Sequence, residues 1–176
     1  MNRTRFWNVF RSELSQHLKR TSFWILVALL GFLAWFQSTH VAEIRPLTEG
    51  IKAFNNCEFN IAAYLSILVL TFYSFFVAVA AGLAVIRDDE HMVGEILHAT
   101  PMTAGEYIWG KFSAVLGVFI LTLILHLLFL ALSCHVFPDA GTSELRGPFR
   151  LGAYLGPATA LAVPTLVFMA GTAFAI

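Results

Sequence analysis

The chain has 176 residues, of which 58% are hydrophobic and only 12% are charged, whereas a soluble domain usually has about 25% charged residues. Mean hydropathy is +0.74, and 11 basic residues balance 11 acidic ones. This composition excludes a disordered chain and most soluble enzymes, and zero net charge leaves no basic excess to hold a nucleic acid. Because the apolar residues fall in long blocks, the sequence predicts an integral membrane protein.

The first segment, residues 1–21, has the pattern of an amphipathic helix. Its apolar residues recur every three or four positions and so share one helical face: Phe6, Trp7, Phe10, Leu14 and Leu18. The polar remainder is mostly basic: Arg3, Arg11, Glu13, Lys19 and Arg20. We expect this helix to lie in the headgroup plane, as an elbow leading into the first span. The alternative is a flank that only directs insertion.

Long apolar stretches predict where the chain crosses the bilayer. Four of them are long enough to span it as helices: 22–38, 60–86, 112–137 and 151–176. We therefore predict an all-α polytopic membrane protein, with about four transmembrane helices in a domain covering 22–176. Pro157 and Pro164 predict a kink in the last span. Since the apolar run continues to the last residue without a polar flank, we expect an N-terminal fragment of a longer protein.

The distribution of basic residues predicts the orientation of the chain. With the N-terminus inside, seven basic residues face the cytoplasm and four face outside. Basic residues are retained on the cytoplasmic side of a membrane. The N-terminus and loop 87–111 are therefore expected in the cytoplasm.

Loop 87–111 carries the densest charge of the chain. The acidic run Asp88–Glu90 would complement the positive start of a helix. Thr100 precedes Pro101, and a residue in that position is pushed out of the helical region. The loop is therefore predicted to contain a short amphipathic helix, a turn and a second helical piece that leads into the third span. This shape would suit the docking of a soluble partner, and a solvated connector is the alternative.

The residues of this loop resemble those of ABC transporter permeases of the ABC-2 type. The resemblance covers the whole chain as a pattern and is most specific in these groups: Arg87-Asp88-Asp89, Gly94-Glu95-Ile96-Leu97, Ala99-Thr100-Pro101, Tyr107 and Gly110-Lys111. It is strongest to the large bacterial permeases that also carry a zinc aminopeptidase domain. The family usually has six spans in each half, and this chain departs from it with four.

The resemblance implies an exporter component in the bacterial cytoplasmic (inner) membrane. It implies a homo- or heterodimer of permease halves, resting on a separate nucleotide-binding ATPase subunit that holds the ATP. The segment from Asp88 to Pro101 would be the coupling helix. Its ATPase-binding residues would be Asp88, Asp89, Glu90, Glu95, Ile96, Leu97, Thr100 and Pro101. A membrane scaffold or assembly factor that does not transport, and that recruits a cytoplasmic partner through loop 87–111, is the alternative function.

Two groups of residues in this loop partly match known sequence motifs. The run Gly105–Lys111 is close to a phosphate-binding loop, but Phe112 stands where that motif needs Ser or Thr for magnesium. His91, Glu95 and His98 share one helical face and could hold zinc. Their spacing is not that of HExxH, so a solvated or partner-facing surface is favoured. We therefore expect no catalytic residue, metal site or cofactor site in this chain.

The spans contain few polar residues. His126 lies in the third span and is a functional candidate by default, although a hydrogen bond to a neighbouring helix is favoured. Two pairs of small residues favour close helix contacts: Ala78 with Gly82, and Gly152 with Gly156. Cys57 and Cys134 both fall near the outer membrane face, where a disulfide and two free thiols both remain open.

Overall fold

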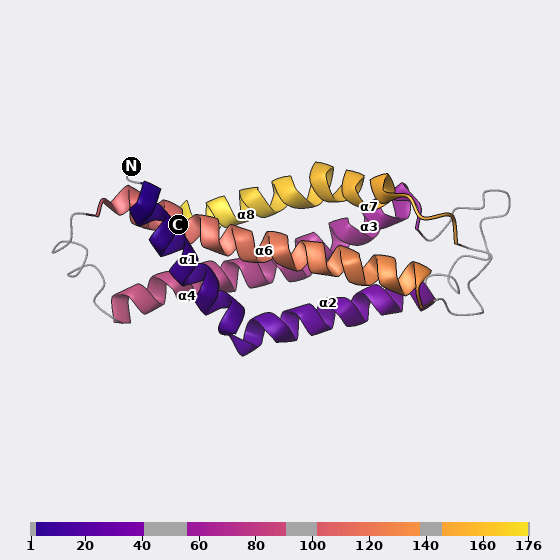
Figure 1. The fold of residues 1–176 in the computed structure, drawn as a ribbon, viewed down its shortest axis with the longest axis horizontal. Coiled ribbons are helices and arrows are strands. Elements are labelled where there is room, and N and C mark those ends of the chain that lie inside the picture. Colours follow the sequence, from indigo (N-terminus) through magenta and orange to yellow (C-terminus); the bar gives the residue numbers. More distant parts are fainter. Residues whose placement is uncertain (1–2, 41–55, 91–101, 138–145, 176) are drawn as a thin grey trace. The chain divides into compact units, whose positions relative to one another are not determined.

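The computed structural model describes residues 3–40, 56–90, 102–137 and 146–175. Within these ranges 91% of the residues are helical and no strand occurs. Four helices are long and apolar enough to cross a membrane: Thr21–Thr39, Glu58–Ala84, Ala104–His135 and Leu151–Ala175 (Figure 1). The prediction of an all-α, multi-pass membrane protein with about four spans is therefore confirmed.

The elements follow one another as a series of helices. In chain order they are α1 (Arg3–Lys19), α2 (Thr21–His40), α3 (Glu58–Leu68), η1 (Val69–Tyr73), α4 (Ser74–Glu90), α6 (Ala104–His135), α7 (Leu151–Pro157), η3 (Ala158–Ala162) and α8 (Val163–Ala175). The two η elements are π-helical, so the second span is α3–η1–α4 and the fourth is α7–η3–α8.

The π-helical segment η3 lies between the two prolines that predicted an irregular fourth span. It begins directly after Pro157 and ends before Pro164. Proline lacks an N–H and its ring crowds the carbonyl four residues earlier, so a wider helical turn is one way to continue past it. The other segment, η1, has no proline and no comparable signal in the sequence.

The chain forms two compact units. Unit 1 consists of Met1–Phe23, Val69–Ile120 and Thr165–Ile176, and unit 2 of Trp24–Leu68 and Leu121–Pro164. The core of unit 1 includes Tyr73, which is fully buried and meets the Phe119 ring edge-on at 6.4 Å between centroids. Phe112 of α6 meets Phe174 of α8 in the same manner at 5.9 Å. Aromatic rings thus join the helices of unit 1.

Unit 2 is held together by close packing of α2 with α6 and of α3 with α7 and η3. A Cβ added at Gly31 of α2 would lie 3.3 Å from the Phe129 ring of α6. A Cβ at Gly156 would lie 2.8 Å from Oε1 of Glu58. Of the three glycines that the sequence placed in small-residue pairs, Gly156 therefore lies at a close contact. Added at Gly82 or Gly152, a Cβ would meet no atom of the described chain within 4 Å.

Large apolar side chains cover much of the surface of the spans. Phe59 is 79% exposed, Phe168 is 70% exposed and Trp24 is 58% exposed. Such a surface is unfavourable in water and suits the hydrocarbon of a bilayer. The exposed apolar residues therefore agree with the membrane location that the helix lengths indicate.

Candidate functional site

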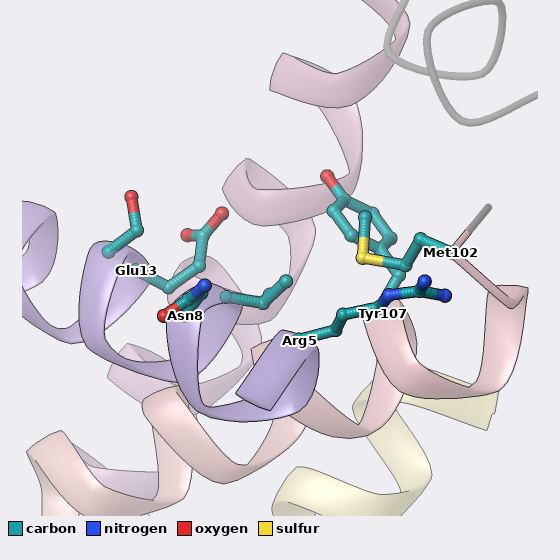
Figure 2. Close-up of a pocket in the computed structure, with 7 residues that line it drawn as sticks. Arg5, Asn8, Glu13, Met102 and Tyr107 are labelled. Atoms are coloured by element: carbon teal, nitrogen blue, oxygen red, sulfur yellow. The ribbon is translucent and has the colours of Figure 1, made fainter. Parts of the chain in front are cut away.

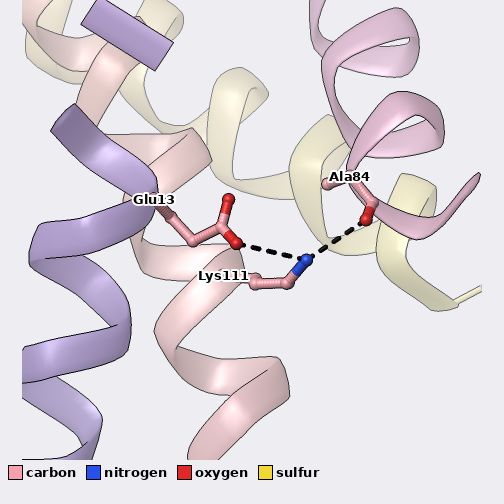
Figure 3. Close-up of polar contacts among 3 residues, drawn as sticks. All are labelled: Glu13, Ala84 and Lys111. Carbon is pink, nitrogen blue, oxygen red and sulfur yellow. Dashed lines mark hydrogen bonds and ion pairs between the residues drawn. The ribbon is translucent and has the colours of Figure 1, made fainter. Parts of the chain in front are cut away.

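A buried cation in the third span joins three helices of unit 1. The Lys111 side chain, on α6, is 6% exposed, and its Nζ lies 3.2 Å from Oε1 of Glu13 on α1. The same Nζ donates a hydrogen bond to the carbonyl oxygen of Ala84 on α4, also at 3.2 Å (Figure 3). It also lies 4.9 Å from the centroid of the Tyr107 ring, one helical turn earlier on α6. One side chain thus connects α1, α4 and α6.

This cluster corrects two expectations from the sequence. Lys111 was expected to end a polar loop and Glu13 to lie on a solvated helix face, whereas the two form a largely buried ion pair. Charged side chains within a span are costly unless they are paired and hydrogen-bonded. Helical periodicity identifies a polar face but does not show that another helix covers it. The pair is therefore visible only when α1 and α6 are brought together.

The absence of a side chain at Gly110 lets α1 approach α6 beside this pair. A Cβ at Gly110 would lie 2.7 Å from Cγ1 and 2.9 Å from Cβ of Val9, which no real structure accommodates without a shift. A Cβ at Gly117 would lie 3.6 Å from the Phe10 ring, an ordinary contact. Since positions separated by seven share a helical face, both glycines present the same side of α6 to α1.

A reciprocal cap fixes the start of α6. The backbone N–H of Thr103 donates to Oε2 of Glu106 at 3.2 Å, and the N–H of Glu106 donates to Oγ1 of Thr103 at 3.3 Å. This is a capping box, and it begins α6 at Ala104. The second helical piece that was predicted to lead into the third span is therefore continuous with that span. The run Gly105–Lys111, which approached a phosphate-binding motif, therefore forms the first turns of this helix. The spacing Thr-x-x-Glu is the sequence signal that could have revealed this start.

An open groove lies beside the cluster, between α1 and the start of α6. It encloses about 420 Å³ and has mainly apolar walls. Its lining residues come from both helices and the residue before the cap: Arg5, Asn8, Val9, Ser12, Glu13, Met102 and Tyr107. Figure 2 shows Arg5 reaching from α1 toward the region of Met102 and Tyr107.

The residues predicted to bind an ATPase are only partly described. Asp88, Asp89 and Glu90 form the last turn of α4, whereas the sequence predicted them at the start of a helix. The second span's helix continues through them. The remaining predicted site residues lie outside the described residues: Glu95, Ile96, Leu97, Thr100 and Pro101. The structure therefore describes the two helices that flank 91–101, and Lys111 joins them.

The suggested zinc face is likewise outside the described residues, because His91, Glu95 and His98 all fall there. In the part of the chain that is described, no group of three or more His, Cys, Asp or Glu side chains could hold a metal ion.

Two expectations about unit 2 are settled by its contacts. His126 is 1% exposed, and its Nε2 lies 2.9 Å from the Tyr64 hydroxyl on α3. The predicted hydrogen bond to a neighbouring helix is therefore confirmed. Cys57 and Cys134 are free thiols, which decides between the two alternatives left by the sequence.

A second polar cluster in unit 2 holds the segment before α7. The buried amide of Asn56 pairs with the backbone of Gly147: the Gly147 N–H donates to Oδ1 at 2.8 Å, and Nδ2 donates to the Gly147 carbonyl at 3.0 Å. Nε2 of His135 lies 3.1 Å from the Tyr154 hydroxyl of α7. These contacts are hydrogen bonds between neutral groups. The cluster therefore holds the backbone of the segment before α7 in place and does not present a reactive group.

No protein family, curated protein or solved structure matches this chain. Its functional interpretation therefore depends on the contacts of the Lys111 cluster and on the sequence pattern of the segment that the cluster flanks.

Proposed function

We propose that this chain is the transmembrane permease component of an ATP-binding cassette exporter. A separate nucleotide-binding subunit binds and hydrolyses the ATP in the cytoplasm of a bacterial cell, and two permease halves pair in the inner membrane. The observation that carries the proposal is the Lys111 cluster, because it joins both helices that flank 91–101.

The cluster provides a mechanical link to the spans from the proposed docking segment, which runs from Asp88 to Pro101. Lys111 lies shortly after the beginning of α6, and Ala84 lies shortly before the end of α4. A force applied to the segment between them acts on two helices that the Nζ of Lys111 holds together. Glu13 adds α1 to the same body. A subunit that binds 91–101 would therefore move three helices of unit 1 together.

The end of α4 has the charge that a basic partner surface would recognise. Asp88, Asp89 and Glu90 form its last turn, where the helix dipole is already negative. Together with the resemblance of 87–111 to ABC-2 permeases, this supports binding of an ATPase subunit.

The surface of α1 supports the proposed orientation. Arg3, Arg11 and Lys19 are exposed on this helix, so they are available to the anionic headgroups of the cytoplasmic leaflet. Trp7 of α1 and Trp109 of α6 are 58% and 57% exposed, and tryptophan is enriched at the membrane interface. These features support a location of the start of α6, and with it the docking segment, at the cytoplasmic surface.

The experiment is charge reversal in the docking segment of the full protein, co-expressed with its nucleotide-binding subunit. Glu90→Lys combined with Glu95→Lys should lower the amount of co-purified ATPase by at least about tenfold, because like charges at an interface cost several kcal/mol and about 1.4 kcal/mol is a factor of ten. The matched control is Glu49→Lys, which makes one such reversal in the loop expected outside and should leave the ratio unchanged. Normal ATPase binding by the double variant would favour the scaffold alternative.

A further inference from the structure

We propose that a groove where α3 and α7 begin binds the headgroup of phosphatidylethanolamine. The groove belongs to unit 2 and encloses about 350 Å³, which falls in the range of small-molecule sites, roughly 300–1,000 Å³. Its lining includes these polar and charged residues: Asn56, Cys57, Glu58 and Arg150. The proposal requires a membrane protein, but it does not require the chain to be a transporter.

The two walls of the groove are fixed to each other. The Asn56 amide of one wall forms two hydrogen bonds with Gly147 of the other, and its Nδ2 also donates to the Pro148 carbonyl at 3.3 Å. All three residues line the groove. The groove is therefore formed before a ligand enters it, which lowers the free-energy cost of binding.

An acid and a base line this groove without neutralising each other. Glu58 is the first residue of α3 and Arg150 directly precedes α7, and both are exposed. Within the ranges that the structure describes, neither side chain forms an ion pair or a hydrogen bond. Oε1 of Glu58 lies 2.8 Å from the position that a Cβ would take at Gly156, so the carboxylate extends from α3 to α7. The groove thus offers a ligand one anion and one cation.

This pair of charges is complementary to a zwitterion with a primary ammonium group. The ammonium of an ethanolamine headgroup can donate hydrogen bonds to the Glu58 carboxylate, and its phosphate can accept two from the planar Arg150 guanidinium. A choline headgroup has no N–H to donate, and a glycerol headgroup has no cation for Glu58. Of these three phospholipid headgroups, ethanolamine is therefore the one that satisfies both residues.

The apolar residues beside the groove favour a lipid over a soluble zwitterion. Two spans begin at the groove, one with Glu58 and one with Leu151, and the end of a span lies at the depth of the headgroups. Phe59, Phe149 and Leu151 are exposed and adjoin the two charged residues in the chain. The acyl chains of a lipid bound in the groove can therefore contact apolar side chains, which a soluble ligand would leave unused.

The first test measures the lipids that the purified full chain retains in neutral detergent micelles. Native mass spectrometry follows equilibration with equal phosphatidylethanolamine, phosphatidylglycerol and phosphatidylcholine, and phosphatidylethanolamine should be retained most. Glu58→Gln is nearly isosteric and should lower phosphatidylethanolamine relative to phosphatidylglycerol about tenfold, because it removes a charge-assisted hydrogen bond. An unchanged ratio in this variant would overturn the proposal, as would equal retention of the ethanolamine and choline lipids by the unaltered protein.

Arg150→Gln tests the phosphate side of the site. It should lower the retention of phosphatidylethanolamine about tenfold, since it removes the cation that holds the phosphate. The matched control is Arg11→Gln, at an exposed position of α1 in unit 1. It should change retention by less than about twofold, because exposed charges contribute little. Equal losses in the two variants would show that general surface charge holds the lipid and would overturn the site.

A third variant fills the groove without changing its charge. Gly152 lines the groove, and a Cβ there would meet no atom of the described chain within 4 Å. Gly152→Leu therefore occupies open space and should also lose phosphatidylethanolamine. Gly171→Leu makes the same change at an equally open glycine of α8 and should retain the lipid. Unchanged retention in Gly152→Leu would overturn the site even if the charge variants lose the lipid.

The thiol of Cys57 reports whether the groove is occupied. It is free, half-buried and part of the lining, whereas Cys134 is buried. Phosphatidylethanolamine at about ten times its Kd should slow the labelling of Cys57 by a maleimide roughly tenfold, in proportion to the fraction of empty sites. Equal labelling rates with phosphatidylethanolamine and with phosphatidylglycerol would contradict the proposal. Soluble phosphoethanolamine at millimolar concentration should give no protection, and protection by it would reject the lipid as the ligand.

Discussion

Both units keep polar groups among apolar helices, but unit 1 does so with charge and unit 2 with neutral hydrogen bonds. In unit 1, Lys111 and Glu13 form a largely buried ion pair. In unit 2, Tyr64 contacts His126, and Asn56 pairs with the backbone of Gly147. A buried ion pair gains little over an apolar replacement, yet losing one partner is very costly. A neutral hydrogen bond between membrane helices contributes less to the free energy of unfolding, and losing one leaves the others in place.

This difference bears on the proposed coupling to an ATPase subunit, which would require part of the molecule to move as one body. The Nζ of Lys111 joins three helices, so its loss would release α1, α4 and α6 from one another at this point. The neutral contacts of unit 2 each join two segments, such as α3 with α6 through Tyr64 and His126. The charged cluster lies at the flanks of the proposed docking segment, which is where transmission of force requires a firm connection.

The largest loss of stability is expected when the cation of unit 1 is removed. Lys111→Met leaves the largely buried carboxylate of Glu13 without its cation, which should destabilise the protein by about 3–5 kcal/mol. The measurement is unfolding by denaturant in detergent. Lys19→Met removes an exposed cation of α1 and should cost about 0.5 kcal/mol or less. Adding Glu13→Gln to Lys111→Met should recover part of the loss, and strictly additive effects would show that the pair is not coupled.

The next prediction concerns the close contact that lets this pair form. Gly110→Ala places a Cβ 2.7 Å from Cγ1 of Val9, whose β-branched side chain cannot rotate freely, and should cost about 1–3 kcal/mol. Gly117→Ala is the matched control on the same face, where the Cβ would make an ordinary contact with Phe10. Thermal unfolding compares them. The added change Val9→Ala should relieve Gly110→Ala, and similar stabilities of the two alanine variants would refute the close approach.

In unit 2, the largest effect is expected at Asn56. Asn56→Ala leaves the N–H and carbonyl of Gly147 without their partner, which should cost about 1–3 kcal/mol, the range for an unsatisfied buried polar group. Asn8→Ala, at an exposed position of α1, is the control and should change stability by no more than about 0.5 kcal/mol. Denaturant unfolding measures both. If the two variants are equally stable, the Asn56 amide does not hold the segment before α7.

The smallest effect is expected at Tyr64. Tyr64→Phe removes only the hydroxyl that contacts Nε2 of His126, and hydrogen bonds between membrane helices average about 0.6 kcal/mol. The same substitution in a His126→Leu background should have no effect, because the partner is already absent. If Tyr64→Phe lowered the free energy of unfolding as much as Lys111→Met does, the charged contacts of unit 1 would not be more important for stability than the neutral contacts of unit 2.

The sequence predicts the four spans well because a bilayer requires long uncharged runs, and these can be read directly. It predicts the charged site poorly. None of Glu13, Glu106 and Lys111 was predicted to be buried, yet Glu106 is 3% exposed and the other two form a largely buried ion pair. Their burial depends on which helices meet, and periodicity within one helix does not specify that. The start of α6 does have a local signal in the capping spacing of Thr103 and Glu106, but that signal was overlooked.

For the neutral contacts between distant residues, the sequence predicted that a hydrogen-bond partner exists but not which residue it is. A polar partner for His126 follows from the cost of leaving imidazole unpaired in lipid. Its identity as Tyr64 does not, because the two residues are 62 positions apart. The π-helical segment η1 likewise has no compositional signature, whereas η3 follows a proline.

The central claim requires the segment between α4 and α6 to face the cytoplasm, where an ATP-hydrolysing subunit can reach it. The direct measurement is labelling of a single cysteine, Glu90→Cys, by a membrane-impermeant thiol reagent in a protein that carries Cys57→Ser and Cys134→Ser. Glu49→Cys in the same background should be labelled in intact cells. We predict that position 90 is protected in intact cells and labelled after permeabilisation. Labelling of position 90 in intact cells would contradict the account.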